Sequence, residues 1–328
     1  MMRRSVSLLV ACLAVLSGQA LAQETYPNRT VRWVVPFPAG GPTDTLSRIL
    51  VARLAEMWGQ SVVVENKGGA SGAIGTDFVA KSQPDGYTLM LGTQSTNASN
   101  MLFFPNLPYD PIKDFQPLTL IGTACMALVT APNIPANTAK EFVEWAKKEG
   151  PNVKQAFGGV GGTSHMACLL FNKIFDLKPT PVAYRGTGPA VNDLIGGHVD
   201  YLCEQVVSMV GPMQTGKIRG IVLSSNERLA SIPDVPGAKE AGAADYQLNV
   251  WSAAYAPRGT PQEVVAKLAA ALDKTLDEPA TAEKLEKLGG TVPPKSERGP
   301  EYLRKTVASD IPRWAPILKE AAETTKAN

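Results

Sequence analysis

Short apolar runs alternate with stretches of helical periodicity along most of the chain. Residues 31–37 form an apolar run, as expected for a strand buried on both faces of a parallel sheet. A helix is predicted over 42–58, because apolar residues recur there at three- and four-residue spacing. Pro42 suits the first turn of this helix, and Asp44 suits the positive end of its dipole.

The same alternation is repeated downstream. Further strands are expected at 61–65, 87–93, 154–157, 181–184, 199–206, 218–223 and 250–256. Helices are expected after the glycine-rich segments 68–75, 158–164 and 185–189, over 262–276, and twice more before the C-terminus. Strands that alternate with helical crossovers predict an α/β fold with mainly parallel sheets.

Two sheets of this kind suggest two lobes. The apolar run 118–129 and the strand near 218–225 lie where the chain could cross between them. We therefore expect a discontinuous first lobe, 23–123 plus 226–328, and a second lobe inserted at 124–225.

The N-terminus indicates export. Residues 1–4 are basic, an apolar run follows, and an A-x-A pattern ends at Ala22, so residues 1–22 are predicted to be a cleaved signal peptide. A lipid anchor on Cys12 is the alternative, although it leaves a short apolar region. No later segment is long and apolar enough for a transmembrane helix. We expect a soluble protein of the periplasm.

Charge and length limit the possible architectures and partners of the chain. The chain has 328 residues, more than one core usually serves. It has 32 basic and 30 acidic residues, and loss of Arg3 and Arg4 with the signal leaves it formally neutral. A neutral chain without a basic cluster argues against nucleic acid as a partner.

The cysteines and histidines argue against a metal or redox centre. Cys125, Cys168 and Cys203 remain after cleavage, without a C-x-x-C spacing, and are expected to be small buried apolar residues. Pairing of Cys168 with Cys203 stays open. The chain has only His165 and His198, which excludes a metal site built on several histidines.

Motifs for catalysis are incomplete. No phosphate-binding P-loop is present, and "GASGA" (69–73) has Ala73 where a nucleophile elbow requires glycine. Ser164 and His165 are adjacent on an expected helix and do not face each other. We expect no catalytic residue and no cofactor. An exported hydrolase that uses Ser164 is retained as an alternative.

Three glycine-rich turns join expected strands to helices: 40–41, 161–164 and 186–188. Each would present backbone N–H groups at the positive end of a helix, where an anion is favoured. Ligands of parallel sheets collect beyond the carboxyl ends of the strands. The glycines either shape the turns alone or hold a carboxylate between two lobes.

Several long motifs, in order, resemble the Bug family, the periplasmic binding proteins of tripartite tricarboxylate transporters. They are "VVPFPAGGPTD", "VENKGGASGAIGTDFVAKSQPDGYTLMLGT", "LPYDPIKDFQPLTLIG", "VAYRGTGPAVNDLIGGHVD" and "APRGTPQEVVAKL". The resemblance covers about 26–293. It implies a two-lobed α/β periplasmic binding protein of the Venus-flytrap, type II-like kind, with a ligand cleft between the lobes and a membrane transporter as its partner.

The resemblance also implies the ligand-binding residues. In the family, the turn after the first strand and the glycine-rich turn of the second lobe pinch a ligand carboxylate, largely through backbone groups. In the first lobe these positions are Phe37, Ala39, Gly40, Gly41, Thr43 and Asp44, with Thr93, Gln94, Ser95 and Asn97 from the loop after the third strand. In the second lobe they are Gly162, Thr163, Ser164, His165, Tyr184, Arg185 and Gly186.

Glu204 departs from the family pattern, which often has an aromatic residue and Asp after the "VD" strand. A Glu204 that faced the cleft would repel a second carboxylate, or favour a ligand with an amine or hydroxyl. Alternatively, Glu204 pairs with Arg185 or caps a loop, and Arg185 could instead clamp the ligand's distal acid. His165 is either a pocket or a packing residue, and His198 is expected on the surface.

Together these features predict a monomeric periplasmic binding protein for a small organic carboxylate, either a dicarboxylate or an aromatic acid. The main alternative is a ligand sensor that presents its closed form to a signalling receptor.

Overall fold

The computed structural model of the protein describes residues 26–326, and the side chains of residues 26–315. The expected signal peptide, 1–22, lies outside the described residues. Within the described part of the chain, no helix is both long and apolar enough to cross a membrane.

The elements alternate along the chain much as their periodicity predicts. The strands are β1 (Val31–Val35), β2 (Val62–Asn66), β3 (Thr88–Thr93), β4 (Phe115–Thr130), β5 (Lys154–Phe157), β6 (Thr180–Ala183), β7 (Tyr201–Gln205), β8 (Arg219–Leu223), β9 (Asn249–Pro257) and β10 (Gly290–Thr291). The α-helices are α2 (Pro42–Trp58), α3 (Ala73–Ala80), α4 (Asn100–Phe103), α5 (Ala139–Glu149), α6 (Thr163–Phe175), α7 (Thr187–Ile195), α8 (Val206–Gln214), α9 (Gln262–Asp277), α10 (Pro279–Lys287) and α11 (Gly299–Lys326). A π-helix, η2 (Ser95–Ser99), follows β3, and 3₁₀ turns lie at Ala70–Gly72, Gly150–Asn152 and Lys295–Glu297.

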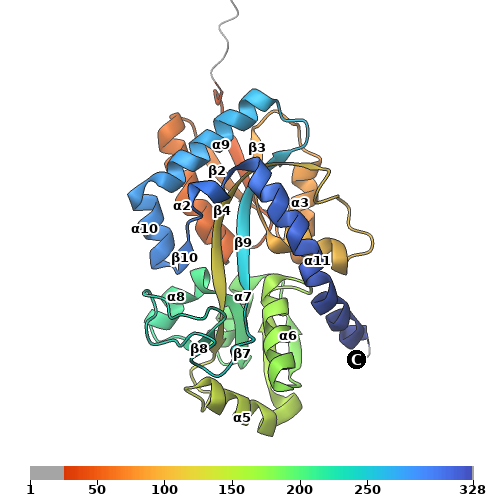
Figure 1. Ribbon diagram of the computed structural model, residues 1–328, viewed down its shortest axis with the longest axis vertical. Helices are drawn as coiled ribbons and strands as arrows, with labels where there is room; N and C mark the ends of the chain where they lie inside the picture. The colour runs from red at the N-terminus through yellow and green to blue at the C-terminus, as the bar shows by residue number, and fades with distance from the viewer. Residues whose placement is uncertain (1–25, 327–328) are drawn as a thin grey trace, which may run out of the picture.

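The strands form two connected sheets, in the order β2-β1-β3-β9-β4-β7-β5-β6. Strand β4 belongs to both, since its residues up to Cys125 pair with β9 and those from Met126 pair with β7. Figure 1 shows β4 and β9 running lengthwise between an upper lobe, with β1 to β3, and a lower lobe, with α5 to α8. The expected two-lobed α/β fold is therefore confirmed.

The sheets are mixed rather than mainly parallel as the sequence predicted, and the parallel and antiparallel pairs occupy different parts of them. The pairs β1–β2, β1–β3, β5–β6 and β5–β7 are parallel, whereas β4 and β9 pair antiparallel with each of their neighbours. The parallel strands lead into α2, α6 and α7, so the glycine turns lie at their carboxyl ends.

Ser224 joins the two strands that cross between the lobes. Its hydroxyl accepts the N–H of Met126 on β4 at 2.8 Å and donates to the carbonyl of Leu248, just before β9, at 2.5 Å. Ser224 thus links β4 to the start of β9 at Met126, where β4 passes from one sheet to the other.

Residues 226–248 contact the second lobe. Gly237 forms a bridge with Leu223 of β8, and the ring of Tyr246 lies 5.3 Å from that of Phe171 on α6. The sequence-based division placed this segment in the first lobe. We propose instead that the chain returns to the first lobe at Asn249.

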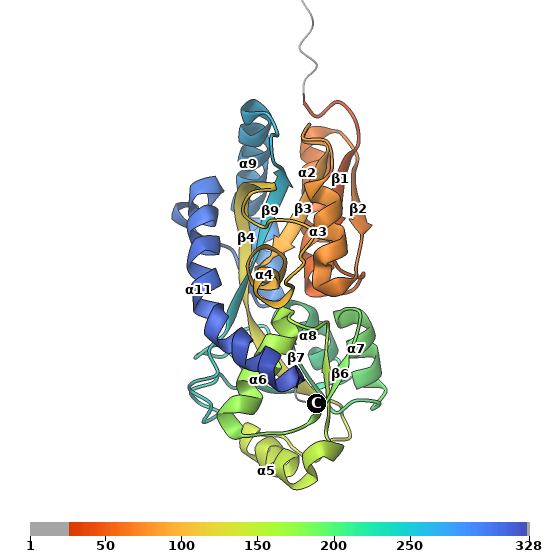
Figure 2. The ribbon, with the colours of Figure 1, turned by 90° about the vertical axis from the view of Figure 1, so that its right-hand side faces the viewer.

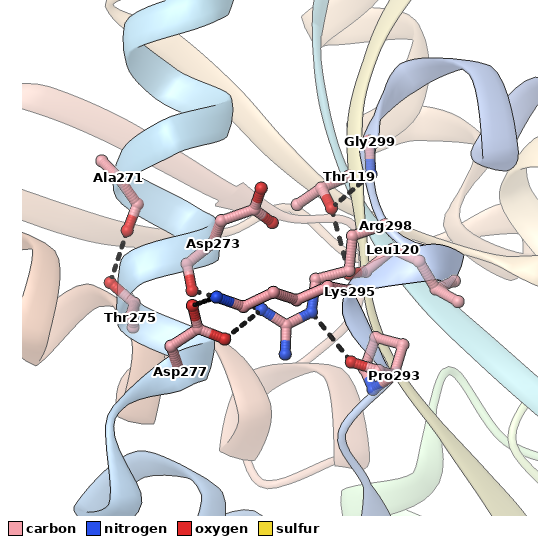
Figure 3. A network of polar contacts seen from close by, with 10 residues as sticks. All are labelled: Thr119, Leu120, Ala271, Asp273, Thr275, Asp277, Pro293, Lys295, Arg298 and Gly299. Carbon is pink, nitrogen blue, oxygen red and sulfur yellow. Dashed lines mark hydrogen bonds and ion pairs between the residues drawn. The ribbon is translucent and has the colours of Figure 1, made fainter.

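The long C-terminal helix α11 begins in the first lobe and extends alongside the second (Figure 2). A polar network fixes its start against α9 (Figure 3). The buried guanidinium of Arg298 donates to Asp277 at 2.8 Å and to the carbonyl of Pro293 at 2.8 Å, and Thr119 accepts the N–H of Gly299 at 3.0 Å. None of these residues lines the cavity described below.

Candidate ligand-binding site

A narrow cavity lies where the turns of the two lobes meet. Half of the predicted site residues line it: Phe37, Gly41, Thr43, Thr93, Ser95, Gly162, Thr163, Ser164 and Glu204. Six further residues line it: Pro38, Pro42 and Thr187, which lie in the turns that the sequence indicated, and Ser71, Gly158 and Gln205, which it did not single out as ligand contacts. Ser71 lies in the quoted motif that ends at Thr93, Gly158 begins the glycine-rich segment 158–164, and Gln205 follows Glu204 directly.

Two helices from different lobes begin at this cavity without a capping side chain. Gly41 precedes α2 and Gly162 precedes α6, and neither helix has a side-chain hydrogen bond at its N-cap. The first helical bonds are Thr45 N–H to Gly41 O and Met166 N–H to Gly162 O. The N–H groups before them have no acceptor within the helix, so two positive helix ends from opposite lobes converge on one cavity.

The lobes touch around the cavity. The hydroxyl of Ser71, in the first lobe, donates to the carbonyl of Val160, in the second. Gly161 has φ +76°, and a Cβ there would lie 2.7 Å from the ring of Phe103 on α4. Gly186 has φ +149°, and a Cβ there would lie 2.6 Å from Pro38. These two positions allow only glycine, because the two lobes approach each other closely there.

Asp44 fastens the turn between β1 and α2. Its carboxylate is buried, accepts the N–H of Gly40 and the side chains of Arg48 and Asn66, each at 3.0 Å, and does not line the cavity. Burial acts to raise the pKa of Asp44, but the hydrogen bonds and the charge of Arg48 together lower it below its usual value. Asp44 therefore holds the loop that carries Phe37 and Gly41.

Glu204 ends β7 and faces the cavity with a side chain that is only 2% exposed. It accepts the hydroxyl of Thr187 at 2.5 Å and the N–H of Gln205 at 2.8 Å. Burial raises the pKa of Glu204 to about 7, although the nearby polar groups of Thr187, Gln205 and Ser164 act to lower it. Arg185 is exposed, and no ion pair joins it to Glu204 among the described residues. The alternative in which these two side chains pair is therefore not observed.

Ser164 and His165 organise the second-lobe turn. Ser164 donates to the carbonyl of Cys203 at 2.7 Å. His165 accepts the N–H of Gly161 through Nδ1 at 3.2 Å and stacks on Phe157, with 4.3 Å between ring centroids. Burial lowers the pKa of His165 to about 4, so the imidazole is neutral at pH 7. His165 shapes the turn and does not line the cavity.

The other predicted residues do not line the cavity. Gln94 donates to Asp310 on α11 at 3.1 Å, and Asn97 accepts the hydroxyl of Thr96 at 2.7 Å, because the π-helix turns both inward. Tyr184 donates to Asp193 at 2.6 Å. Ala39 and Gly40 are exposed, and Gly186 contacts Pro38 between the lobes. These residues, with Asp44, His165 and Arg185, surround the cavity without lining it.

The cysteines and His198 lie where the sequence suggests. Cys125, Cys168 and Cys203 are buried and free. The N–H of Cys203 donates to Sγ of Cys168 at 3.1 Å, so the pair is in contact without a disulfide. His198 is exposed and lies 3.5 Å from Asp193.

Comparisons with known proteins place this geometry in a family. The sequence model described as the tripartite tricarboxylate transporter family receptor matches residues 46–322. Protein BugT of Bordetella pertussis is 32% identical over 93% of this chain and 93% of its own. MatC of Rhodopseudomonas palustris, solved with bound malate, is 39% identical with a TM-score of 0.84, covering 89% of this chain and 100% of its own. Rpa4515 of R. palustris, solved with adipate, is 31% identical with a TM-score of 0.86, covering 90% of this chain and 97% of its own. The chain belongs to the tripartite tricarboxylate transporter receptor family, whose solved relatives include periplasmic binding proteins.

Proposed function

We propose that the protein captures a small organic carboxylate in the periplasm and delivers it to a tripartite tricarboxylate-type membrane transporter. It would act after removal of its signal peptide behind Ala22, as a monomer, and by binding without turnover. The ligand would occupy the cavity between the lobes.

The convergence of two uncapped helix N-termini carries this proposal. The start of α2 comes from the first lobe and the start of α6 from the second, and both line the cavity. Backbone N–H groups at two positive helix ends can hold a carboxylate without an arginine. A carboxylate that bridges both lobes would favour the closed arrangement, because only that arrangement supplies both sets of donors.

The relatives support the chemical class. MatC was solved with malate and Rpa4515 with adipate, both of which are carboxylic acids. Phe37 offers an aromatic ring in the cavity for the carbon skeleton of such an acid. The side chains that face that skeleton, rather than the helix ends, would decide which acid fits.

Thermal unfolding of the protein without residues 1–22 tests the proposal. The panel contains malate, succinate, adipate, benzoate and terephthalate, each with its amide as a matched control. A ligand at 100 times its dissociation constant should stabilise the fold by about 2.7 kcal/mol. We expect at least one acid to raise the unfolding temperature while its amide does not. Stabilisation by amides or cations alone would contradict carboxylate capture.

A further inference from the structure

Glu204 is a buried carboxylate inside a cavity that otherwise suits an anion. It shares the second-lobe wall with Ser164 and Thr187, and it is only 2% exposed. A ligand that reached from the helix ends across the cavity would meet this carboxylate. Glu204 is thus placed to select what the ligand carries at that point.

The groups that face Glu204 are neutral. They are the hydroxyls of Thr187 and Ser164, the N–H of Gln205 and the thiol of Cys168. Burial raises the pKa of Cys168 well above its usual value, so the thiol carries no charge at pH 7. Across residues 26–315, where side chains are described, no ion pair involves Glu204. Within that range the buried charge of Glu204 has no cation beside it.

The residues whose side chains the structure describes therefore supply hydrogen-bond donors to Glu204 but no countercharge. Each carboxylate oxygen can accept more than one hydrogen bond, so the single contact shown for each leaves acceptor capacity free. A hydroxyl or ammonium group of a ligand would use this capacity, and an ammonium would also neutralise the charge. A second carboxylate beside Glu204 would instead be repelled, because like charges inside a protein are weakly screened.

We propose that this site selects carboxylic acids that carry a hydroxyl or ammonium donor within reach of Glu204, and disfavours acids that place a second carboxylate there. The proposal rests on carboxylate capture by the helix ends, as set out above, and it narrows the substrate class. The acid group would lie at the N-termini of α2 and α6, and the donor at Glu204.

Calorimetric titration with matched acids tests the selection. One series has the same four-carbon chain and differs at its end: butyrate, 4-hydroxybutyrate, 4-aminobutyrate and succinate. The other series, succinate, malate and aspartate, differs at the second carbon. In at least one series, we expect an acid with a donor to bind ten times more tightly than the acid without it.

The variant Glu204→Gln removes the charge and nearly keeps the shape. It should reduce that preference to threefold or less and strengthen succinate binding. Glu144→Gln, at an exposed position on α5, is the matched control and should change neither. An unchanged preference in Glu204→Gln, or equal or tighter binding of plain diacids by the native protein, would overturn the proposal.

The pH dependence of ligand affinity in the native protein tests the same proposal without a variant. If the ligand donor binds ionised Glu204, the affinity for 4-hydroxybutyrate should be constant above about pH 7 and fall by up to tenfold per pH unit below it. Diacid affinity that rises as the pH falls, and exceeds that of the donor acids, would mean that neutral Glu204 donates to a carboxylate. If acids bind without any such preference, only the selection fails. If no acid of either series binds, carboxylate capture fails with it.

Discussion

Two buried carboxylates beside the same cavity have opposite pKa shifts. Asp44, in the first lobe, is 4% exposed, and Glu204, in the second, is 2% exposed. The pKa of Asp44 lies below its usual value, whereas that of Glu204 is raised to about 7. Burial acts to raise both, so burial alone does not explain the difference.

The groups that contact each carboxylate explain why the two pKa values shift in opposite directions. Asp44 has a guanidinium, an amide and a backbone N–H as donors, and Arg48 compensates its charge. Glu204 has a hydroxyl and a backbone N–H but no cation. Of the two carboxylates, only Glu204 lines the cavity. It can accept further hydrogen bonds from a ligand, and its charge is not compensated by a cation among the described residues. The Asp44 carboxylate instead accepts its hydrogen bonds from Gly40, Arg48 and Asn66.

The largest expected effect concerns the pH dependence of stability. Because the folded pKa of Glu204 is about 7 and its unfolded value near 4.5, its contribution is fully present below about pH 4.5 and is lost as the pH rises through 7. The loss amounts to about 3 kcal/mol. The free energy of unfolding of Glu204→Gln, relative to the native protein, should therefore increase by that amount between pH 4.5 and 8. Urea titrations at several pH values measure it, and a difference that stays constant with pH would contradict the assigned environment.

The next largest effect is structural. Asp44→Ala leaves the N–H of Gly40 and the amide of Asn66 without this acceptor, which should cost about 2 kcal/mol of unfolding free energy at pH 7. The loosened turn should also weaken acid binding. Denaturant unfolding and titration of the variant check both. A loss below about 0.5 kcal/mol would show that Asp44 is not what fastens the turn.

Thr187→Val removes a donor from Glu204 at nearly constant shape. We expect a loss of about 1 kcal/mol at pH 8, where the carboxylate is ionised, and a smaller loss at pH 5, where it is neutral. Paired unfolding experiments at the two pH values measure the contrast. Equal losses would mean that the hydroxyl does not stabilise the charge of Glu204.

The smallest effect should come from replacing Arg48, which pairs with Asp44. Arg48 is 57% exposed, so Arg48→Gln should cost only about 0.5 kcal/mol at neutral pH and low salt. The folded pKa of Asp44 lies below its unfolded value of about 4, so the ionised carboxylate stabilises the fold above that pH. The loss in Arg48→Gln should therefore shrink as the pH falls below about 4 and through the folded pKa of Asp44. Unfolding at pH 7 and pH 3 distinguishes the two conditions, and a loss that persists at pH 3 would indicate a packing role for Arg48.

Local signals account for the parts of the fold that the sequence predicted. The range of α2 was obtained because Pro42 suits a helix start and the apolar spacing ends near Trp58, where Gly59 takes a left-handed conformation. Helix α8 was missed because the apolar residues of β7 continue into it without a break, and such runs do not separate a strand from a helix. Helix α5 was missed although its start has a capping signal. The Thr138 hydroxyl accepts the N–H of Glu141, and the Glu141 carboxylate accepts the N–H of Asn137.

The candidate site was predictable where glycines mark helix starts and unpredictable where side-chain direction matters. The turns before α2 and α6 lie at the cavity as the sequence suggested. Gln94 and Asn97 turn inward because the chain after β3 forms a π-helix, which has no clear sequence signature. The partners of Glu204 depend on how β7 lies beside the start of α7, a tertiary feature that one sequence does not reveal.

Removing one backbone donor tests the central claim most directly. Thr163 is the first residue of α6, and Gly162 before it is extended, so Thr163→Pro fits the helix start and deletes only the side chain and the N–H. Thr163→Ala deletes the side chain and keeps the N–H. Gln262→Pro, at the exposed start of α9, controls for proline itself.

Calorimetric titration of these variants with the tightest-binding acid gives the answer. Loss of a charge-assisted hydrogen bond should weaken binding to Thr163→Pro at least tenfold relative to Thr163→Ala, with Gln262→Pro like the native protein. Equal affinities of Thr163→Pro and Thr163→Ala would contradict capture of the carboxylate by the N-terminus of α6.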